Sequence, residues 1–232
     1  MMDASQRISV IVPVFNGERY IRDALDSIFE QEYSPLEVVV VDDGSTDNLA
    51  TVLSVEFPSL RYHYQKHGGL SAARNAGIRL ASGRWIGFLD ADDLWAPGKL
   101  KSQVKYLAAH TELDAVFGHI QQFYTPEEEE KVRQAYRYSR EVLPGFDPDT
   151  MLIAAKAIRR IGAFDEKVKM GEFLDWFARA QEAALVYAML PEVLAFRRIH
   201  VSNVSITRRN ETAAEYARLL KAALDRRRKS GY

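Results

Sequence analysis

Phe88-Leu89-Asp90-Ala91-Asp92-Asp93 is the stretch that decides the fold, because it places three carboxylates directly after an apolar run. Trp85 to Leu89 is rich in aromatic and branched apolar residues, which predicts a buried strand. Open α/β sheets bind ligands beyond the carboxyl ends of their strands, where these carboxylates fall. Clustered carboxylates repel one another unless a cation such as Mg²⁺ or Mn²⁺ joins them. The alternative is a solvated turn that caps the next helix.

Strand and helix patterns alternate four times around this stretch, within roughly 110 residues. The predicted strands are 8–14, 36–41, 60–64 and 85–89, and the predicted helices are 18–30, 49–56, 71–80 and 99–109. This order predicts an α/β fold with a mostly parallel, Rossmann-like sheet and helices on both faces.

The second half of the chain is less regular. Residues 114–124 predict one or two strands, and 125–148 an excursion that is partly helical and mobile. Two apolar runs, 151–158 and 186–190, are candidates to join the sheet. Helices are expected at 171–184 and 211–229.

Composition narrows the class of protein. The chain has 232 residues, 47% of them apolar, which suits one large domain. Its 31 basic residues nearly balance its 32 acidic ones, which argues against a nucleic-acid partner. It has no cysteine, which excludes thiolate metal sites and a cysteine nucleophile. No apolar run approaches the roughly 18 residues that span a bilayer, and residues 1–7 lack a signal peptide's apolar region, so we expect a cytoplasmic protein.

Polar residues follow the other predicted strands at the same edge of the sheet. Asn16 and Glu18 come after the first strand, close to Pro13, while Asp42 and Asp43 follow the second. Carboxyl ends of parallel strands converge on one cleft, and an acidic cleft binds phosphate when a cation bridges the two. For Asp42 and Asp43, an ordinary turn is the alternative.

Arg74 opens or lines the third predicted helix, where it can pair with a cleft carboxylate, reach a phosphate or lie on the surface. The chain lacks G-x-G-x-x-G after the first strand, G-x-x-x-x-G-K-[ST], H-E-x-x-H and G-x-S-x-G. Dinucleotide, P-loop, zinc-protease and α/β-hydrolase interpretations are therefore disfavoured.

Eight short motifs, in order over roughly 195 residues, resemble the family 2 glycosyltransferases with the GT-A fold. They are Val10–Asn16, Val41–Asp47, Gly69–Gly77, Phe88–Asp93, Gly162–Glu166, Gly171-Glu172, Leu190–Leu194 and Arg198–Asn203. The resemblance implies a single GT-A domain that moves a sugar from a nucleoside-diphosphate donor to an acceptor hydroxyl. Residues 1–110 would bind the donor, 111–210 would supply the acceptor side and the catalytic base, and 211–232 would form a C-terminal helix.

The resemblance also implies roles for single residues. Asp92 would bind Mn²⁺ or Mg²⁺, and His200 would touch that metal or be a structural histidine. Asp42 would accept a hydrogen bond from the nucleobase, and Asp90 would face the ribose or the metal's shell. The implied nucleotide-sugar-binding positions are Pro13, Val14, Asn16, Glu18, Asp42, Arg74, Asp90 and Ala91.

One departure concerns the catalytic base, which in the family is usually the Asp of a Glu-Asp pair. Here Phe173 follows Glu172, so that Asp is missing. Asp175 lies three residues after Glu172, which puts both carboxylates on one helix face. Glu172 is the first candidate base and Asp175 the second. Loss of the base would leave a catalytically silent nucleotide-sugar-binding module.

The reaction that the resemblance implies is metal-dependent and of the hexosyltransferase type. It would invert the anomeric carbon, because no second carboxylate is poised as a nucleophile. A nucleotidyltransferase of similar fold is a further alternative. The acceptor would be a glycan, a lipid-linked hydroxyl or another alcohol in glycan biosynthesis. The basic end Arg226–Lys229 would either touch an anionic membrane or lie in solvent.

Overall fold

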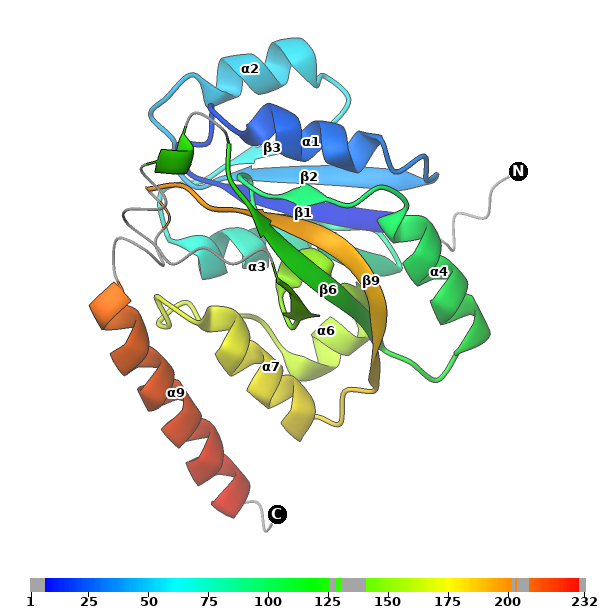
Figure 1. Cartoon of the computed structure of the whole chain (residues 1–232), viewed down its shortest axis with the longest axis vertical. Coiled ribbons are helices and arrows are strands. Elements are labelled where there is room, and N and C mark those ends of the chain that lie inside the picture. Colours follow the sequence, from blue (N-terminus) through cyan, green and yellow to red (C-terminus); the bar gives the residue numbers. More distant parts are fainter. Residues whose placement is uncertain (1–6, 126–127, 131–140, 202, 204–208, 230–232) are drawn as a thin grey trace.

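The computed structural model describes residues 7–125, 128–130, 141–201, 203 and 209–229. Within these residues, nine strands form one sheet in the order β3-β2-β1-β4-β8-β6-β9-β5, and β7 pairs with β6. Helices cover both faces of the sheet (Figure 1). This arrangement confirms the predicted α/β domain with a Rossmann-like sheet.

The first half alternates strand and helix as the sequence predicts. Its elements are β1 (Ile8–Val14), α1 (Ile21–Phe29), β2 (Leu36–Asp42), α2 (Leu49–Glu56), β3 (Arg61–Tyr64), α3 (Leu70–Leu80), β4 (Trp85–Phe88), β5 (Leu94–Trp95) and α4 (Lys99–Ala109). Strands β1 to β4 pair with one another in parallel. Their carboxyl ends therefore meet at one edge of the sheet.

The second half completes the same sheet. Its elements are β6 (Ala115–Phe123), β7 (Val142–Gly145), η3 (Pro148–Thr150), β8 (Leu152–Ala154), α6 (Ala155–Ile161), α7 (Glu172–Glu182), β9 (Tyr187–Arg198) and α9 (Arg209–Lys229). The long pairing of β6 with β9 is parallel. The antiparallel pairings of β5, β7 and β8 are short, with two to four residue pairs each.

Several second-half expectations need refinement. Residues 114–124 form one strand, and the run 151–158 gives a three-residue strand followed by helix α6. In the expected excursion 125–148, positions 141–148 hold β7 and the start of η3. Residues 126–127 and 131–140 lie outside the described residues, so the predicted mobility there stays a prediction.

Alternate residues of β2 explain why helices cover both faces. Val38 and Val40 join the large apolar cluster that contains α1, whereas Val39 and Val41 pack against Ala73 and neighbouring small residues of α3. Successive strand side chains point to opposite faces, so a continuous apolar strand needs a cover on each side. Among the described helices, none is both long and apolar enough to cross a membrane.

Candidate functional site

A cavity of about 1010 Å³ opens at the carboxyl edge of the parallel strands. We call it the carboxyl-edge cavity. Four predicted site residues line it: Arg74 from α3, Asp90 and Asp92 from the loop after β4, and Glu172 at the start of α7. Residues far apart in the sequence thus converge, as the sheet topology predicts.

Arg74 holds two of these carboxylates. Its side chain is 2% exposed, and its Nη2 donates to Asp90 Oδ1 at 2.8 Å while its Nη1 donates to Glu172 Oε1 at 2.5 Å. Burial alone would lower the pKa of Arg74, but the charges of Asp90 and Glu172 raise it above its usual range. The guanidinium is therefore a permanent cation shared between two acids of the cavity.

Asp92, in the loop after β4, contacts His200, in the loop after β9. Its Oδ2 is 2.8 Å from His200 Nε2, and Asn203 Nδ2 donates to the same oxygen at 3.4 Å. The Tyr20 ring packs on the imidazole at 5.0 Å between centroids. Burial and the charge of Asp92 raise the pKa of Asp90, although Arg74 opposes this change.

The side chains around Asp92 offer ligands to a divalent cation. The described residues hold no group of three or more His, Asp or Glu side chains placed for a metal ion. A carboxylate oxygen and an imidazole nitrogen 2.8 Å apart nevertheless suit Mn²⁺ or Mg²⁺ that takes its other ligands from substrate oxygens and water. The residues fit a cation that arrives with an anionic ligand.

Two further carboxyl groups, those of Asp93 and Asp149, are buried beneath the loop that follows β4. Asp149 of η3 is 1% exposed and accepts a hydrogen bond from the Asp90 amide at 2.9 Å. Asp93, which is also buried, interacts with the Asp149 carboxyl group. Burial raises the pKa of both well above the usual value. Sequence reasoning missed Asp149, and its one signal was a polar run, Asp147–Thr150, directly before a buried strand.

The residues predicted for the nucleobase end lie beside the cavity rather than in its wall. Pro13 and Val14 are buried in β1, and Ala91 is half-buried. Asp42 is 2% exposed and accepts from the Ser45 amide and the Tyr62 hydroxyl, both at 2.7 Å.

Asn16 and Glu18 both bind the turn after β2. The Thr46 amide donates to Asn16 Oδ1 at 2.8 Å, and the Asn48 amide donates to Glu18 Oε2 at 3.1 Å. At this end the cavity wall is formed by Phe15 and His67, whose rings lie 4.3 Å apart. Phe15 lies within the motif Val10–Asn16, but the resemblance implied no role for it.

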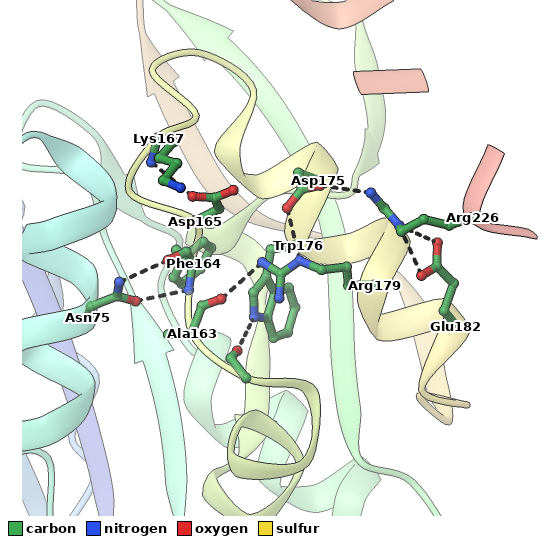
Figure 2. A network of polar contacts seen from close by, with 11 residues as sticks. Asn75, Ala163, Phe164, Asp165, Lys167, Asp175, Trp176, Arg179, Glu182 and Arg226 are labelled. Atoms are coloured by element: carbon green, nitrogen blue, oxygen red, sulfur yellow. Dashed lines mark hydrogen bonds and ion pairs between the residues drawn. The ribbon is translucent and has the colours of Figure 1, made fainter. Parts of the chain in front are cut away.

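Asp175 points away from the cavity into a network between α7 and α9 (Figure 2). It accepts from Arg179 Nε at 2.9 Å and lies 3.5 Å from Arg226 Nη1, while Arg226 also bonds to Glu182. It is not among the residues that line the cavity. Of the two predicted bases, the geometry therefore favours Glu172.

Other lining residues received no role from the sequence. Lys169, Arg197, Asp147 and Tyr216 all face the cavity, and Asn203 joins it from the loop after β9. Arg197 comes from strand β9 and Tyr216 from α9, while the others come from loops, and all of them reach the cavity through tertiary packing rather than local pattern.

Solved structures share this fold. S. aureus TarS (residues 1–349) is similar with a TM-score of 0.67 and 23% identity, over 83% of this chain and 60% of that one. The mannosyltransferase PcManGT of Pyrobaculum calidifontis, solved with GDP-Man and Mn²⁺, is similar with a TM-score of 0.63 and 24% identity, over 92% of this chain and 64% of that one. The chain thus spans about 60% of the length of these solved chains. The fold class is that of the GT-A glycosyltransferases.

Sequence similarity gives the family. The profile "Glycosyl transferase family 2" matches residues 9–166. An uncharacterised glycosyltransferase of Rickettsia typhi is 30% identical over 227 residues, which cover 89% of this chain and 68% of the relative. The chain belongs to glycosyl transferase family 2.

Proposed function

We propose that this chain transfers a sugar from a nucleoside-diphosphate donor to an acceptor hydroxyl. The observation that carries the proposal is the bridge in which buried Arg74 holds Asp90 and Glu172 in one cavity wall, next to the Asp92–His200 pair. Structures of the similar TarS contain UDP or UDP-GlcNAc, and the PcManGT structure contains GDP-Man. A donor of the same chemical class suits an acidic cavity that has the Phe15 and His67 rings at one end.

Asp92 and His200 would hold Mn²⁺ or Mg²⁺ in this proposal. The cation would offset negative charge on the departing diphosphate. Arg74 neutralises Asp90 and Glu172, which reduces repulsion of the incoming diphosphate. Phe15 and His67 offer ring faces for a nucleobase, and Asp42, with Pro13 and Val14, would support that end from behind.

Glu172 is the proposed base. As the acceptor oxygen forms its bond to the anomeric carbon, the bond from that carbon to the diphosphate oxygen breaks, and the acceptor proton passes to Glu172. The nucleoside diphosphate leaves with the electron pair. A single displacement of this kind inverts the anomeric configuration. The hydrogen bond from Arg74 keeps the Glu172 carboxylate oriented in the cavity.

A silent nucleotide-sugar-binding module is the second candidate, and Phe173 favours it. This ring stands where the family usually has its Asp and is 8% exposed, packed at 5.8 Å from the Trp176 ring. Such a module would bind the donor without turnover. A nucleotidyltransferase would instead release pyrophosphate.

The deciding experiment combines binding and turnover. Nucleotide sugars are screened by thermal shift with and without Mn²⁺, and the stabilising donor is then incubated with mixed acceptors. The proposal expects Mn²⁺-dependent stabilisation, release of a nucleoside diphosphate, and loss of that release in Glu172→Gln. Stabilisation without release would support the silent module, and pyrophosphate release would support a nucleotidyltransferase.

We also propose a division of the domain by role. Residues 1–110 bind the donor, residues 111–210 bind the acceptor and supply the base, and residues 211–229 add to the cavity wall through Tyr216.

Contact with an anionic membrane is proposed for α9, since Leu220 and Leu224 are 53% and 54% exposed next to its basic end. Sedimentation with phosphatidylserine vesicles tests this contact, and retention of Leu220→Ser/Leu224→Ser on the vesicles would contradict it.

A further inference from the structure

The base side of the carboxyl-edge cavity is apolar and aromatic. Phe146, Phe173, Leu174 and Phe177 line the cavity there, and we call these four residues the aromatic wall. Phe146 is 47% exposed, unlike most large apolar side chains of the molecule. An aromatic ring that is half exposed in a cavity offers its face to a ligand.

The aromatic wall has a firm backing. The Phe146 ring lies 5.3 Å from that of Phe177 and 6.0 Å from that of Tyr187. Phe117, which is 0% exposed, lies 5.7 Å from Phe146 and also 5.7 Å from Phe177. The open ring is therefore part of a packed cluster, so a ligand would not have to order it.

Phe173, at the position where the family usually has Asp, belongs to this aromatic cluster. Its ring packs at 5.9 Å against Phe177 and at 6.4 Å against Phe117. The exchange removes a charge beside Glu172 and extends the apolar cluster under the cavity. The base side of the site is thus less polar than a Glu-Asp pair would make it.

The aromatic wall and the proposed base line the same cavity. Glu172 and Phe177 are five residues apart on α7, a rise of about 7–8 Å along the helix axis. One ligand in the cavity can therefore contact both side chains. The cation nearest to Glu172, Arg74, is already shared between two carboxylates, so it offers little to a polyanionic acceptor.

We propose that the acceptor carries a flat apolar group next to its hydroxyl and that this group lies on Phe146 and Phe177. This inference rests on the proposed function, because it treats Glu172 as the base that faces the acceptor. An aromatic ring and the C–H face of a pyranose share the required chemistry. The bonds made and broken are those of the transfer described above.

The test measures binding of phenyl β-D-glucopyranoside, methyl β-D-glucopyranoside and benzyl alcohol by titration in the presence of UDP or GDP with Mn²⁺. Phe146→Ala should weaken the phenyl glucoside about tenfold and leave nucleotide affinity unchanged. Phe146→Leu, which keeps the apolar volume, should lose most of the same affinity because the flat face is gone. Phe29→Ala is the matched control, since Phe29 is 42% exposed on α1 outside the cavity.

The probes separate the two sources of the flat face. An effect on both the phenyl glucoside and benzyl alcohol assigns the wall to an aromatic group, and an equal effect on methyl and phenyl glucosides assigns it to a sugar face. If nucleotide binds but no probe distinguishes wild type from Phe146→Ala, the inference is overturned and the proposed function stands. If no nucleotide binds, the proposed function itself fails.

Discussion

Replacement of Arg74 by Met should unfold the protein more easily, and by an amount that depends on pH. The side chain is 2% exposed and is the cation between Asp90 and Glu172. Removing the cation of a buried ion group leaves uncompensated charge, which costs about 3–5 kcal/mol. With a urea m-value of about 2 kcal/mol/M, the midpoint should fall by about 1.5–2.5 M at pH 8.

The pH dependence follows from Asp90. Burial raises its pKa, and without Arg74 the pKa rises further because the opposing charge is lost. A folded-state pKa above the unfolded value means that the folded state binds the extra proton, so stability falls as pH rises and recovers as pH falls. The deficit of Arg74→Met relative to wild type should therefore be smaller at pH 5 than at pH 8.

Urea unfolding followed by circular dichroism at both pH values measures this deficit. Arg22→Met is the control, because Arg22 makes an exposed pair with Glu56 and should unfold close to the wild-type midpoint. Adding Glu172→Gln to Arg74→Met removes one uncompensated charge and should restore part of the loss. A deficit below about 1 kcal/mol at pH 8, or one that grows toward pH 5, would refute the role of Arg74 as a shared counter-ion.

Three further predictions concern other groups. Asp92→Asn should reduce Mn²⁺-dependent binding of a nucleoside diphosphate at least tenfold by calorimetry, and unchanged binding with and without EDTA would contradict the assignment of Asp92. Burial lowers the pKa of Lys99 to about 7, so its folded state releases a proton that the unfolded state keeps, and stability should rise with pH above 7 by up to about 1.4 kcal/mol per unit. Lys99→Met should flatten this rise in urea titrations while Lys101→Met, an exposed change on the same helix, should not. Asp175→Asn should retain nucleoside-diphosphate release, in contrast to Glu172→Gln, and equal losses in both would return Asp175 to the list of bases.

The parallel half of the fold is readable from the sequence because its signals are local. The alternation of apolar strands with periodic helices predicted α2 and α4 to the residue. The carboxylates after β4 were visible for the same reason. Asp149, which lies behind the Asp90 loop, and the ring of Phe146, which lines the cavity, were not. Both come from segments whose positions depend on long-range pairing of β8 with β4 and of β7 with β6. Three-residue spacing suggested that Asp175 shares a face with Glu172, yet Arg179 and Arg226 turn it toward α9.

The shared guanidinium of Arg74 also has a consequence for ligand binding. One of its nitrogens hydrogen bonds to Asp90 and another to Glu172, the proposed base. Any ligand that draws Asp90 away from Arg74 therefore strengthens the remaining bond to Glu172. Two sites that share one counter-ion are thermodynamically coupled, and the coupling is reciprocal. The expected result is that nucleotide and acceptor change each other's affinity by the same factor. Titration of each ligand with and without the other measures this factor, and equal affinities in both settings would show that Arg74 acts on each carboxylate separately.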